Sequence, residues 1–315
     1  MITEPSSSSV PTEGQGAANT KPWLGILLAI IGATLWGVSG TFGQFLFHER
    51  GVNVEWMITV RLLVAGSLLL LISSFDKRQS LFSIWKNRSD LIQLIIFSIA
   101  GMVTIQYTYF AAIKYSNAAT ATILQFLGAV IIAIYLSLKA LKVPSLKELI
   151  ALFIAVIGTF LLVTHANFDN LSISPLGLTL GLASAVAVAI YSLQPTKLLR
   201  KYPAHIIVGW AMLIGGILFS FVHAPWKIEG QWDSQAISYA SFIVIFGTLI
   251  PCFAYLSAVK IVGGQTASLL GSAEPLSAAF MAVIWLQVPF GLMDWLGSAC
   301  IISTIFILSI GKKAG

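Results

Sequence analysis

The chain has 315 residues, of which 57% are hydrophobic and only 10% are charged, and its mean hydropathy is +0.89. Soluble domains carry about 25% charged residues, because charged side chains are the ones that remain at a water-exposed surface. The composition therefore excludes a soluble enzyme, a disordered chain and a nucleic-acid-binding protein. It indicates an integral membrane protein, and the net charge of +6 fits loops rich in Lys and Arg.

The first 22 residues differ from the rest of the chain. They are polar, rich in Ser, Gly and Thr, and show no hydrophobic periodicity. We therefore expect 1–22 to be a disordered cytoplasmic tail. It lacks the basic start of a signal peptide, and the apolar run that follows is too long for one.

Beyond residue 22 the sequence contains ten long apolar stretches. A helix needs about 20 such residues to cross a bilayer, and runs this continuous do not suit the short alternating strands of a β-barrel. The connections are short, and no phosphate-binding glycine loop is present, so ATP-driven pumping is not expected. The ten expected spans are residues 23–47, 55–73, 90–113, 116–137, 146–164, 175–196, 204–223, 236–259, 264–286 and 291–310.

The distribution of Lys and Arg predicts the orientation. With the amino terminus in the cytoplasm, 14 of the 18 basic residues fall in cytoplasmic segments and three in outer segments, with Arg61 inside the second span. Cytoplasmic loops carry such an excess. We therefore expect a multi-pass plasma (bacterial inner) membrane protein with both termini in the cytoplasm.

An internal repeat appears when the sequence is shifted by 146 residues. Residues 109–124 then match 255–270 at six of sixteen positions, including Tyr109 with Tyr255, where average composition gives about one match by chance. Each half, 23–164 and 175–310, carries five expected spans, so the halves cross the membrane in opposite senses. The sequence thus predicts an all-α fold of ten transmembrane helices built as two inverted five-helix repeats, a hallmark of secondary transporters.

Several short motifs are spread over both halves of the chain. They are Leu35-Trp36-Gly37, Arg61, Tyr109 to Ala121, its repeat at Tyr255 to Ala267, Glu274-Pro275, and the glycines Gly158 and Gly297 near the end of each half. Together with the ten-span repeat, these motifs resemble those of the EamA-type branch of the drug/metabolite transporter superfamily, over about residues 23–310.

The resemblance implies a transporter of small metabolites, as a proton antiporter, an exporter or a facilitator. The superfamily handles amino acids, quaternary amines, sugar conjugates and drugs, so the substrate stays open. The family often has a proline in the fourth span, where this chain has Ala129 at the position equivalent to Pro275. We therefore expect a helix break at Pro275 in the second half. The sequence gives no support for a matching break in the first half.

Two ionisable side chains fall within expected spans, where such groups are costly and usually functional. Glu274 precedes Pro275, which removes a helix hydrogen bond, and this pairing suits a substrate or proton-coupling site. In the alternative interpretation, Glu274 pairs with Arg61 or with hydroxyl groups and has a structural role only. Arg61 can hold a substrate carboxylate or extend to the outer rim in a structural role, which we favour.

Aromatic and amide side chains supply the other candidates for substrate binding. Rings inside spans can line a pocket and hold a cation, although Trp and Tyr also gather at membrane interfaces. Glutamines in spans either join helices or face a wet cavity. The candidates are Trp36, Tyr109, Gln125, Trp210 and Tyr255. Cys252 and Cys300 lie in apolar runs and are expected to be small core residues rather than metal ligands, and no metal or cofactor is expected.

Two alternatives from other classes remain. Gly37-Val38-Ser39-Gly40 matches the G-x-S-G of intramembrane serine proteases, but the base such an enzyme needs near Ser39 is missing, since all four histidines fall at span ends or in loops. A passive channel would need a continuous polar lining, usually from an oligomer. For a transporter, the expected partners are a small-molecule substrate, the lipid bilayer and protons. The chain is expected to be a monomer or a homodimer.

Overall fold

The computed structural model describes residues 22–75, 80–141, 143–165 and 173–309, and its regular structure within these ranges is entirely helical. The expected tail lies outside them, apart from Pro22. The α-helices and short or π-helical segments (η) are α1 Pro22–His48, α2 Val54–Ser74, η1 Ser83–Lys86, α3 Arg88–Ile96, η2 Phe97–Val103, α4 Thr104–Tyr115, α5 Ala118–Phe126, α6 Gly128–Lys139, α7 Leu146–Thr164, α8 Pro175–Leu193, α9 Thr196–Leu199, α10 Ala204–Phe219, α11 Ser234–Val244, η3 Ile245–Leu249, α12 Ile250–Leu270, α13 Ala273–Ile284 and α14 Leu292–Ser309.

Among the described residues, six helical segments are long and apolar enough to cross a membrane. They are Pro22–His48, Val54–Ser74, Arg88–Tyr115, Ala118–Lys139, Pro175–Leu199 and Ser234–Val259. Shorter apolar helices follow at Ala204–Phe219, Ala273–Ile284 and Leu292–Thr304. The described part of the chain is therefore all-helical, with helices suited to a membrane, and the count of ten spans stays a prediction.

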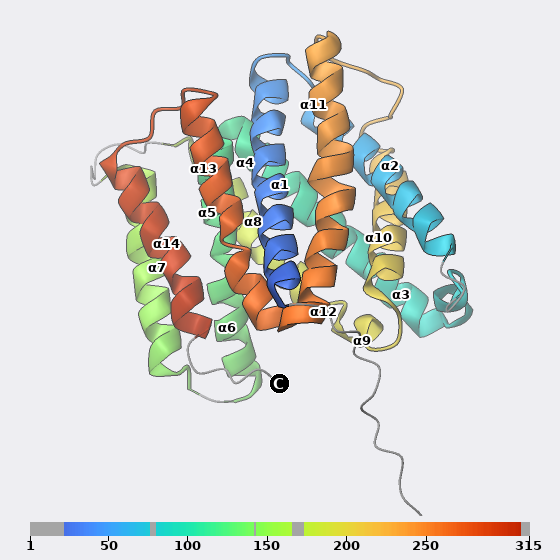
Figure 1. Ribbon diagram of the computed structural model, residues 1–315, viewed down its shortest axis with the longest axis horizontal. Coiled ribbons are helices and arrows are strands. Elements are labelled where there is room, and N and C mark those ends of the chain that lie inside the picture. The colour runs from blue at the N-terminus through green and yellow to red at the C-terminus, as the bar shows by residue number, and fades with distance from the viewer. Residues whose placement is uncertain (1–21, 76–79, 142, 166–172, 310–315) are drawn as a thin grey trace, which may run out of the picture.

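The helices pack around α1, which lies near the middle of the bundle (Figure 1). It contacts α12 and α13 along its length. On one side of the molecule α2 packs against α10, and on the opposite side α7 packs against α14, while α4 and α5 lie against α8. Segments far apart in the sequence are thus neighbours throughout the bundle.

Helical irregularities occur at corresponding places in the two halves. The π-helical segments Phe97–Val103 and Ile245–Leu249 end 146 residues apart. The helix α5 ends at Phe126 and α6 begins at Gly128, while α12 ends at Leu270 and α13 begins at Ala273. The first half therefore contains a helix interruption although it lacks the proline, which corrects our expectation from Ala129.

One expected boundary is wrong. The first half turns at Ser116, and the side chain of Asn117 caps the next helix by accepting the backbone N–H of Thr120 at 2.8 Å. We expected a matching connection between residues 259 and 264, but α12 runs from Ile250 to Leu270 as one helix. The residue 146 positions after Asn117 is Gly263, which has no side-chain oxygen to cap a new helix.

The pair α7 and α14 is held by glycines and one ion pair. Gly158 and Gly297 face each other's carbonyl oxygens so closely that a Cβ on either would lie 2.8 or 2.7 Å from the other's oxygen. At the end of α7, His165 Nε2 lies 2.8 Å from Asp294 Oδ1. Small residues permit this close helix approach, so these two glycines have a packing role.

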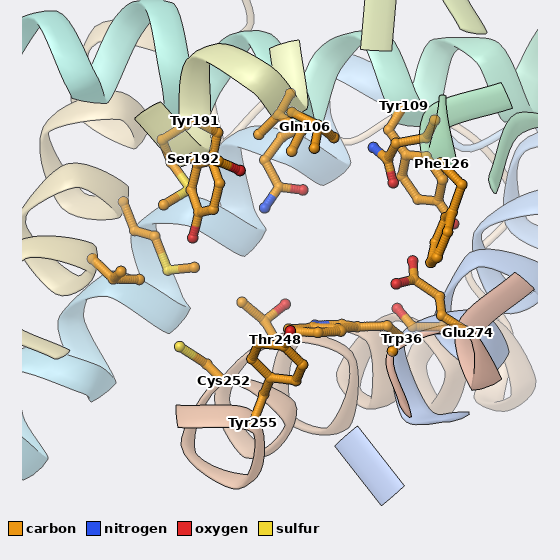
Figure 2. A pocket seen from close by; sticks show the side chains of 18 of the residues that line it. Trp36, Gln106, Tyr109, Phe126, Tyr191, Ser192, Thr248, Cys252, Tyr255 and Glu274 are labelled. Carbon is orange, nitrogen blue, oxygen red and sulfur yellow. The ribbon is translucent and has the colours of Figure 1, made fainter. Parts of the chain in front are cut away.

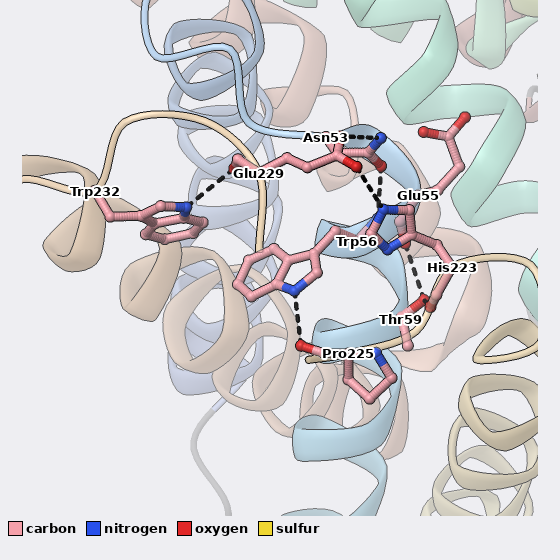
Figure 3. A network of polar contacts seen from close by, with 8 residues as sticks. All are labelled: Asn53, Glu55, Trp56, Thr59, His223, Pro225, Glu229 and Trp232. Carbon is pink, nitrogen blue, oxygen red and sulfur yellow. Dashed lines mark hydrogen bonds and ion pairs between the residues drawn. The ribbon is translucent and has the colours of Figure 1, made fainter. Parts of the chain in front are cut away.

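A polar network ties the α10–α11 loop to the start of α2 (Figure 3). Asn53 caps α2 by accepting the N–H of Trp56 at 2.9 Å, and its amide donates to Glu229 at 3.0 Å. The indole of Trp56 donates to the Pro225 carbonyl at 2.8 Å, and His223 Nε2 lies 3.4 Å from Glu229. The hydrogen bond from Asn53, with that from His223, lowers the pKa of Glu229.

Candidate functional site: a cavity between the two halves

A cavity of about 390 Å³ lies inside the bundle (Figure 2). This volume falls within the range of about 300–1,000 Å³ that is typical of small-molecule sites. Neither α7 nor α14 contributes to its wall. The lining residues are Trp36, Ser39, Arg61, Met102, Ile105, Gln106, Tyr109, Gln125, Phe126, Ala129, Ile132, Val188, Tyr191, Ser192, Val208, Met212, Thr248, Cys252, Tyr255, Gly271 and Glu274.

Eight of these lining residues form four pairs separated by 146 positions. The pairs are Met102 with Thr248, Gln106 with Cys252, Tyr109 with Tyr255, and Gln125 with Gly271. The interval is the one at which the two sequence halves match. Equivalent faces of the third and fourth expected spans, and of the eighth and ninth, therefore point into one cavity.

Arg61 is buried, and each of its three side-chain nitrogen atoms donates a hydrogen bond to the protein. Its Nε donates to Thr248 Oγ1 at 2.5 Å, and its Nη2 donates to the Gly247 carbonyl at 2.8 Å, both in the π-helical segment η3. Its Nη1 donates to Gln106 Oε1 at 3.1 Å, and its guanidinium carbon lies 4.9 Å from the Phe110 ring centroid. The residue is 6% exposed, so it does not extend to the rim, and its contacts support a structural role inside the cavity wall.

Glu274 lies just after the interruption between α12 and α13. In a regular helix the Gly271 carbonyl would accept the N–H of residue 275, but this residue is a proline and has no N–H. The carbonyl instead accepts the N–H of Glu274 at 3.0 Å. Proline in a first helical turn costs little, because N–H groups there have no intrahelical partner. Figure 2 shows the Glu274 side chain reaching into the cavity. No described side chain forms a hydrogen bond or ion pair with its carboxylate.

Aromatic rings form much of the wall around this carboxylate. The ring centroids of Trp36 and Tyr255 lie 5.4 Å apart, at an interplanar angle of 49°. The hydroxyl of Tyr109 lies 2.9 Å from Thr122 Oγ1, so this phenol is already hydrogen-bonded within the protein. Phe126 and Tyr191 extend the aromatic surface on the far side of the cavity from Tyr255 (Figure 2).

The remaining candidates are distributed differently. Gln125 lines the cavity and donates to Ser184 Oγ at 2.7 Å. Trp210 lies elsewhere, where its indole donates to the Leu81 carbonyl at 2.9 Å and its ring packs against Phe82 and Trp85. Five of the six substrate-binding candidates therefore share one cavity, and Trp210 contacts the segment before α3 instead.

Several lining residues were not predicted from the sequence. Thr248, Phe126 and Met102 were not singled out, and Cys252 was expected to be a core residue although it lines the cavity. When the 146-residue match is extended one helical turn towards the amino terminus, it pairs Gln106 with Cys252. This pairing would have identified both residues as candidates for the cavity wall. Phe126 belongs to no lining pair, and no sequence signal separates it from packing residues.

Ser39 lies in the cavity wall without a base. Its Oγ is buried and has no hydrogen-bond partner among the described residues, and no histidine lines the cavity. A Cβ on Gly247 would collide with this hydroxyl, so Gly247 is needed for the close contact of α1 with η3. Among the described residues, no three His, Cys, Asp or Glu side chains gather as metal ligands.

Comparison with known proteins identifies the family. The profile of the EamA-like transporter family matches residues 23–164 and 175–310. The chain belongs to this family. The two matched regions coincide with the two halves inferred from the 146-residue shift.

Two relatives and one solved structure match this chain over most of their own length. An uncharacterized inner membrane transporter of Salmonella typhimurium, YicL, is 38% identical over 92% of this chain and 96% of its own. An uncharacterized Bacillus subtilis transporter, YwfM, is 24% identical over 91% of this chain and 94% of its own. One solved crystal structure with 15% identity covers 90% of this chain and 96% of its own at a TM-score of 0.60, which shows a shared fold.

Proposed function

We propose that this chain is a secondary transporter that moves a small organic solute across a bacterial inner membrane by alternating access. The observation that carries the proposal is the cavity wall built from four pairs of repeat-related residues. In transporters built from inverted repeats, two halves exchange conformations around a site at their interface. Membership of a transporter family and the name of the Salmonella typhimurium relative support the same function.

The proposal includes ten spans arranged as two inverted five-helix repeats, with both termini in the cytoplasm. The paired π-helical segments and paired helix interruptions support a duplicated architecture. The excess of Lys and Arg in alternate loops supports the orientation. A single chain supplies the whole cavity wall, so a monomer or each subunit of a homodimer can carry a complete site.

Coupling to protons through Glu274 is part of this proposal. A carboxylate without a partner in a low-dielectric site favours either a proton or a cation. The titratable and charged groups that share its cavity are Arg61, Tyr109, Tyr191, Cys252 and Tyr255. Since Arg61 already donates to three protein groups, Glu274 is the group best placed to exchange a proton for a solute.

The test is tracer counterflow with purified protein in proteoliposomes, using amino acids, quaternary amines and lipophilic cations as test solutes. A carrier loaded with unlabelled solute transiently accumulates label against its gradient, whereas a channel only equilibrates it. We expect counterflow for one solute class, and a pH gradient to drive net accumulation that Glu274→Gln abolishes. Counterflow without pH-driven accumulation would indicate a facilitator, and equilibration without counterflow would contradict the carrier.

A further inference from the structure

The two charged side chains that line the cavity differ in how the protein holds them. Arg61 and Glu274 are the lining residues with formally charged side chains at neutral pH. Each of the three nitrogen atoms of Arg61 donates to a protein oxygen, and separating these pairs would leave buried polar groups unsatisfied. Three of the five N–H groups of the guanidinium are therefore held by oxygens of the protein, which fixes its position in the cavity wall.

Glu274 stands in the opposite situation. Its carboxylate has no hydrogen bond or salt bridge with any described residue, and it projects into the cavity between Phe126 and Trp36 (Figure 2). An unpaired carboxylate away from water is costly. A cation that enters the cavity relieves this cost, whereas an anion adds repulsion to it.

The rings beside Glu274 favour the same kind of ligand. Trp36 and Tyr255 form a tilted pair with centroids 5.4 Å apart, and Phe126 lines the cavity near the carboxylate. Aromatic faces attract ammonium groups through the ring quadrupole, and they also contact the apolar body of an organic ligand. A carboxylate surrounded by rings is thus suited to an amine attached to an apolar group.

We infer that the substrate is a small organic monocation, with its ammonium group at Glu274 and its apolar body against Trp36, Tyr255 and Phe126. The cavity of about 390 Å³ has ample room for one aromatic ring with a short side chain, since an apolar cavity of about 150 Å³ already binds benzene. This inference rests on the proposed transport function for its physiological meaning, although binding can be measured without transport.

The experiment uses four ligands that share a phenyl ring and a two-carbon arm and differ in charge. They are 2-phenylethylamine, phenylalanine, phenylacetate and 2-phenylethanol, respectively a cation, a zwitterion, an anion and a neutral alcohol. A ligand that binds the folded state raises the melting temperature of the protein. We expect a concentration-dependent rise with the amine and little or none with the other three at the same concentration.

Native cysteines locate the binding. Cys252 lines the cavity, whereas Cys300 lies at the α7–α14 contact beside Gly158. In a Cys300→Ser background, the amine should slow alkylation of Cys252 at least threefold and the alcohol should not. A rise in melting temperature without protection of Cys252 would place the amine elsewhere and overturn the assignment.

Two carboxylate variants separate charge from folding. Glu274→Gln should remove the response to the amine, and Glu274→Asp should retain part of it. Asp294→Asn is the matched control, because this buried carboxylate is paired with His165 outside the cavity; this variant should respond to the amine as the wild type does. An unchanged response in Glu274→Gln would refute the inference.

Failure of this inference and failure of the transport proposal have different signatures. Selective binding of the amine without counterflow would support the cation site and refute the transporter. Counterflow of phenylalanine or phenylacetate, with no preference for the amine, would support the transporter and refute the cation site. Preference for the zwitterion, lost in Arg61→Lys, would show that Arg61 does receive a substrate carboxylate.

Discussion

The two helix interruptions beside the cavity occupy equivalent places and carry different chemistry. Counting back 146 positions from Glu274 leads to Gly128. A Cβ at Gly128 would lie 2.8 Å from the Ala185 carbonyl oxygen and 2.9 Å from Val188, so α8 leaves no room for a side chain. The matching position in the second half opens into the cavity and holds the unpaired carboxylate. The scaffold is therefore duplicated, while the carboxylate is present at the second interruption alone.

Removing that charge has the largest expected effect. Glu274→Gln keeps the shape of the side chain and abolishes its ability to pair with a cation or to exchange a proton. We expect transport to fall by about tenfold or more, since 1.4 kcal/mol of lost binding already corresponds to tenfold in affinity. The measurement is initial counterflow rate with equal amounts of folded protein. Undiminished flux in this variant would contradict the functional asymmetry between the halves.

The loss of a hydrogen-bonded contact between the halves, that of Arg61 with η3, should have the next largest effect. Arg61→Lys keeps the positive charge but loses the planar fork that holds Thr248, Gln106 and the Gly247 carbonyl. We expect a loss of stability of about 1–3 kcal/mol, as for buried polar groups left unpaired, measured by thermal unfolding in detergent. Stability equal to that of the wild type would show that Arg61 does not fix η3.

Gly128 is the first-half equivalent of Glu274, and adding a side chain there tests why this position is a glycine. Gly128→Ala forces a methyl group against α8, and overpacking of this kind costs about 1–3 kcal/mol. Gly291→Ala is a suitable control, because a Cβ there meets only the Asp294 carboxylate at 3.7 Å. If thermal unfolding shows equal melting temperatures for the two variants, steric exclusion by α8 does not explain the asymmetry.

Gln125 lies two residues before the interruption at Leu127, where no carboxylate is present, and its loss should matter less. Gln125→Ala removes the hydrogen bond to Ser184, which is worth about 1 kcal/mol, and leaves the charge at Glu274 in place. We expect counterflow to change by less than about fivefold at this energy. A larger loss than that of Glu274→Gln would reverse the roles assigned to the two halves.

A partnered carboxylate outside the membrane provides the last contrast. The pKa of Glu229 is lowered from its ordinary 4.5, so its stabilising contribution is present above pH 4.5 and is lost as the pH falls through the lower folded-state pKa. The hydrogen-exchange protection factors of residues 220–233, which correct for the intrinsic slowing of amide exchange in acid, should fall over that acidic range in the wild type. In Glu229→Gln this fall should be absent, with transport at neutral pH unchanged.

Much of the fold and part of the site followed from sequence because they depend on repeated local patterns. The shift of 146 residues placed Tyr109 and Tyr255 as partners, and both line the cavity. The depth of Arg61 could not be predicted, since it depends on the approach of η3 from the other half. Nor could the interruption at Leu127, which no proline marks, or the position of Trp210, whose ring suits a pocket and a packing contact equally.

Access to Cys252 from the two sides of the membrane tests alternating access most directly. In a Cys300→Ser background Cys252 is the single thiol, and it lines the cavity. A membrane-impermeant thiol reagent is applied to right-side-out and to inside-out vesicles that contain a trapped thiol dye. We predict labelling of Cys252 in both preparations while the dye stays unreacted. Labelling from one side alone, or reaction of the trapped dye through an open pore, would contradict alternating access.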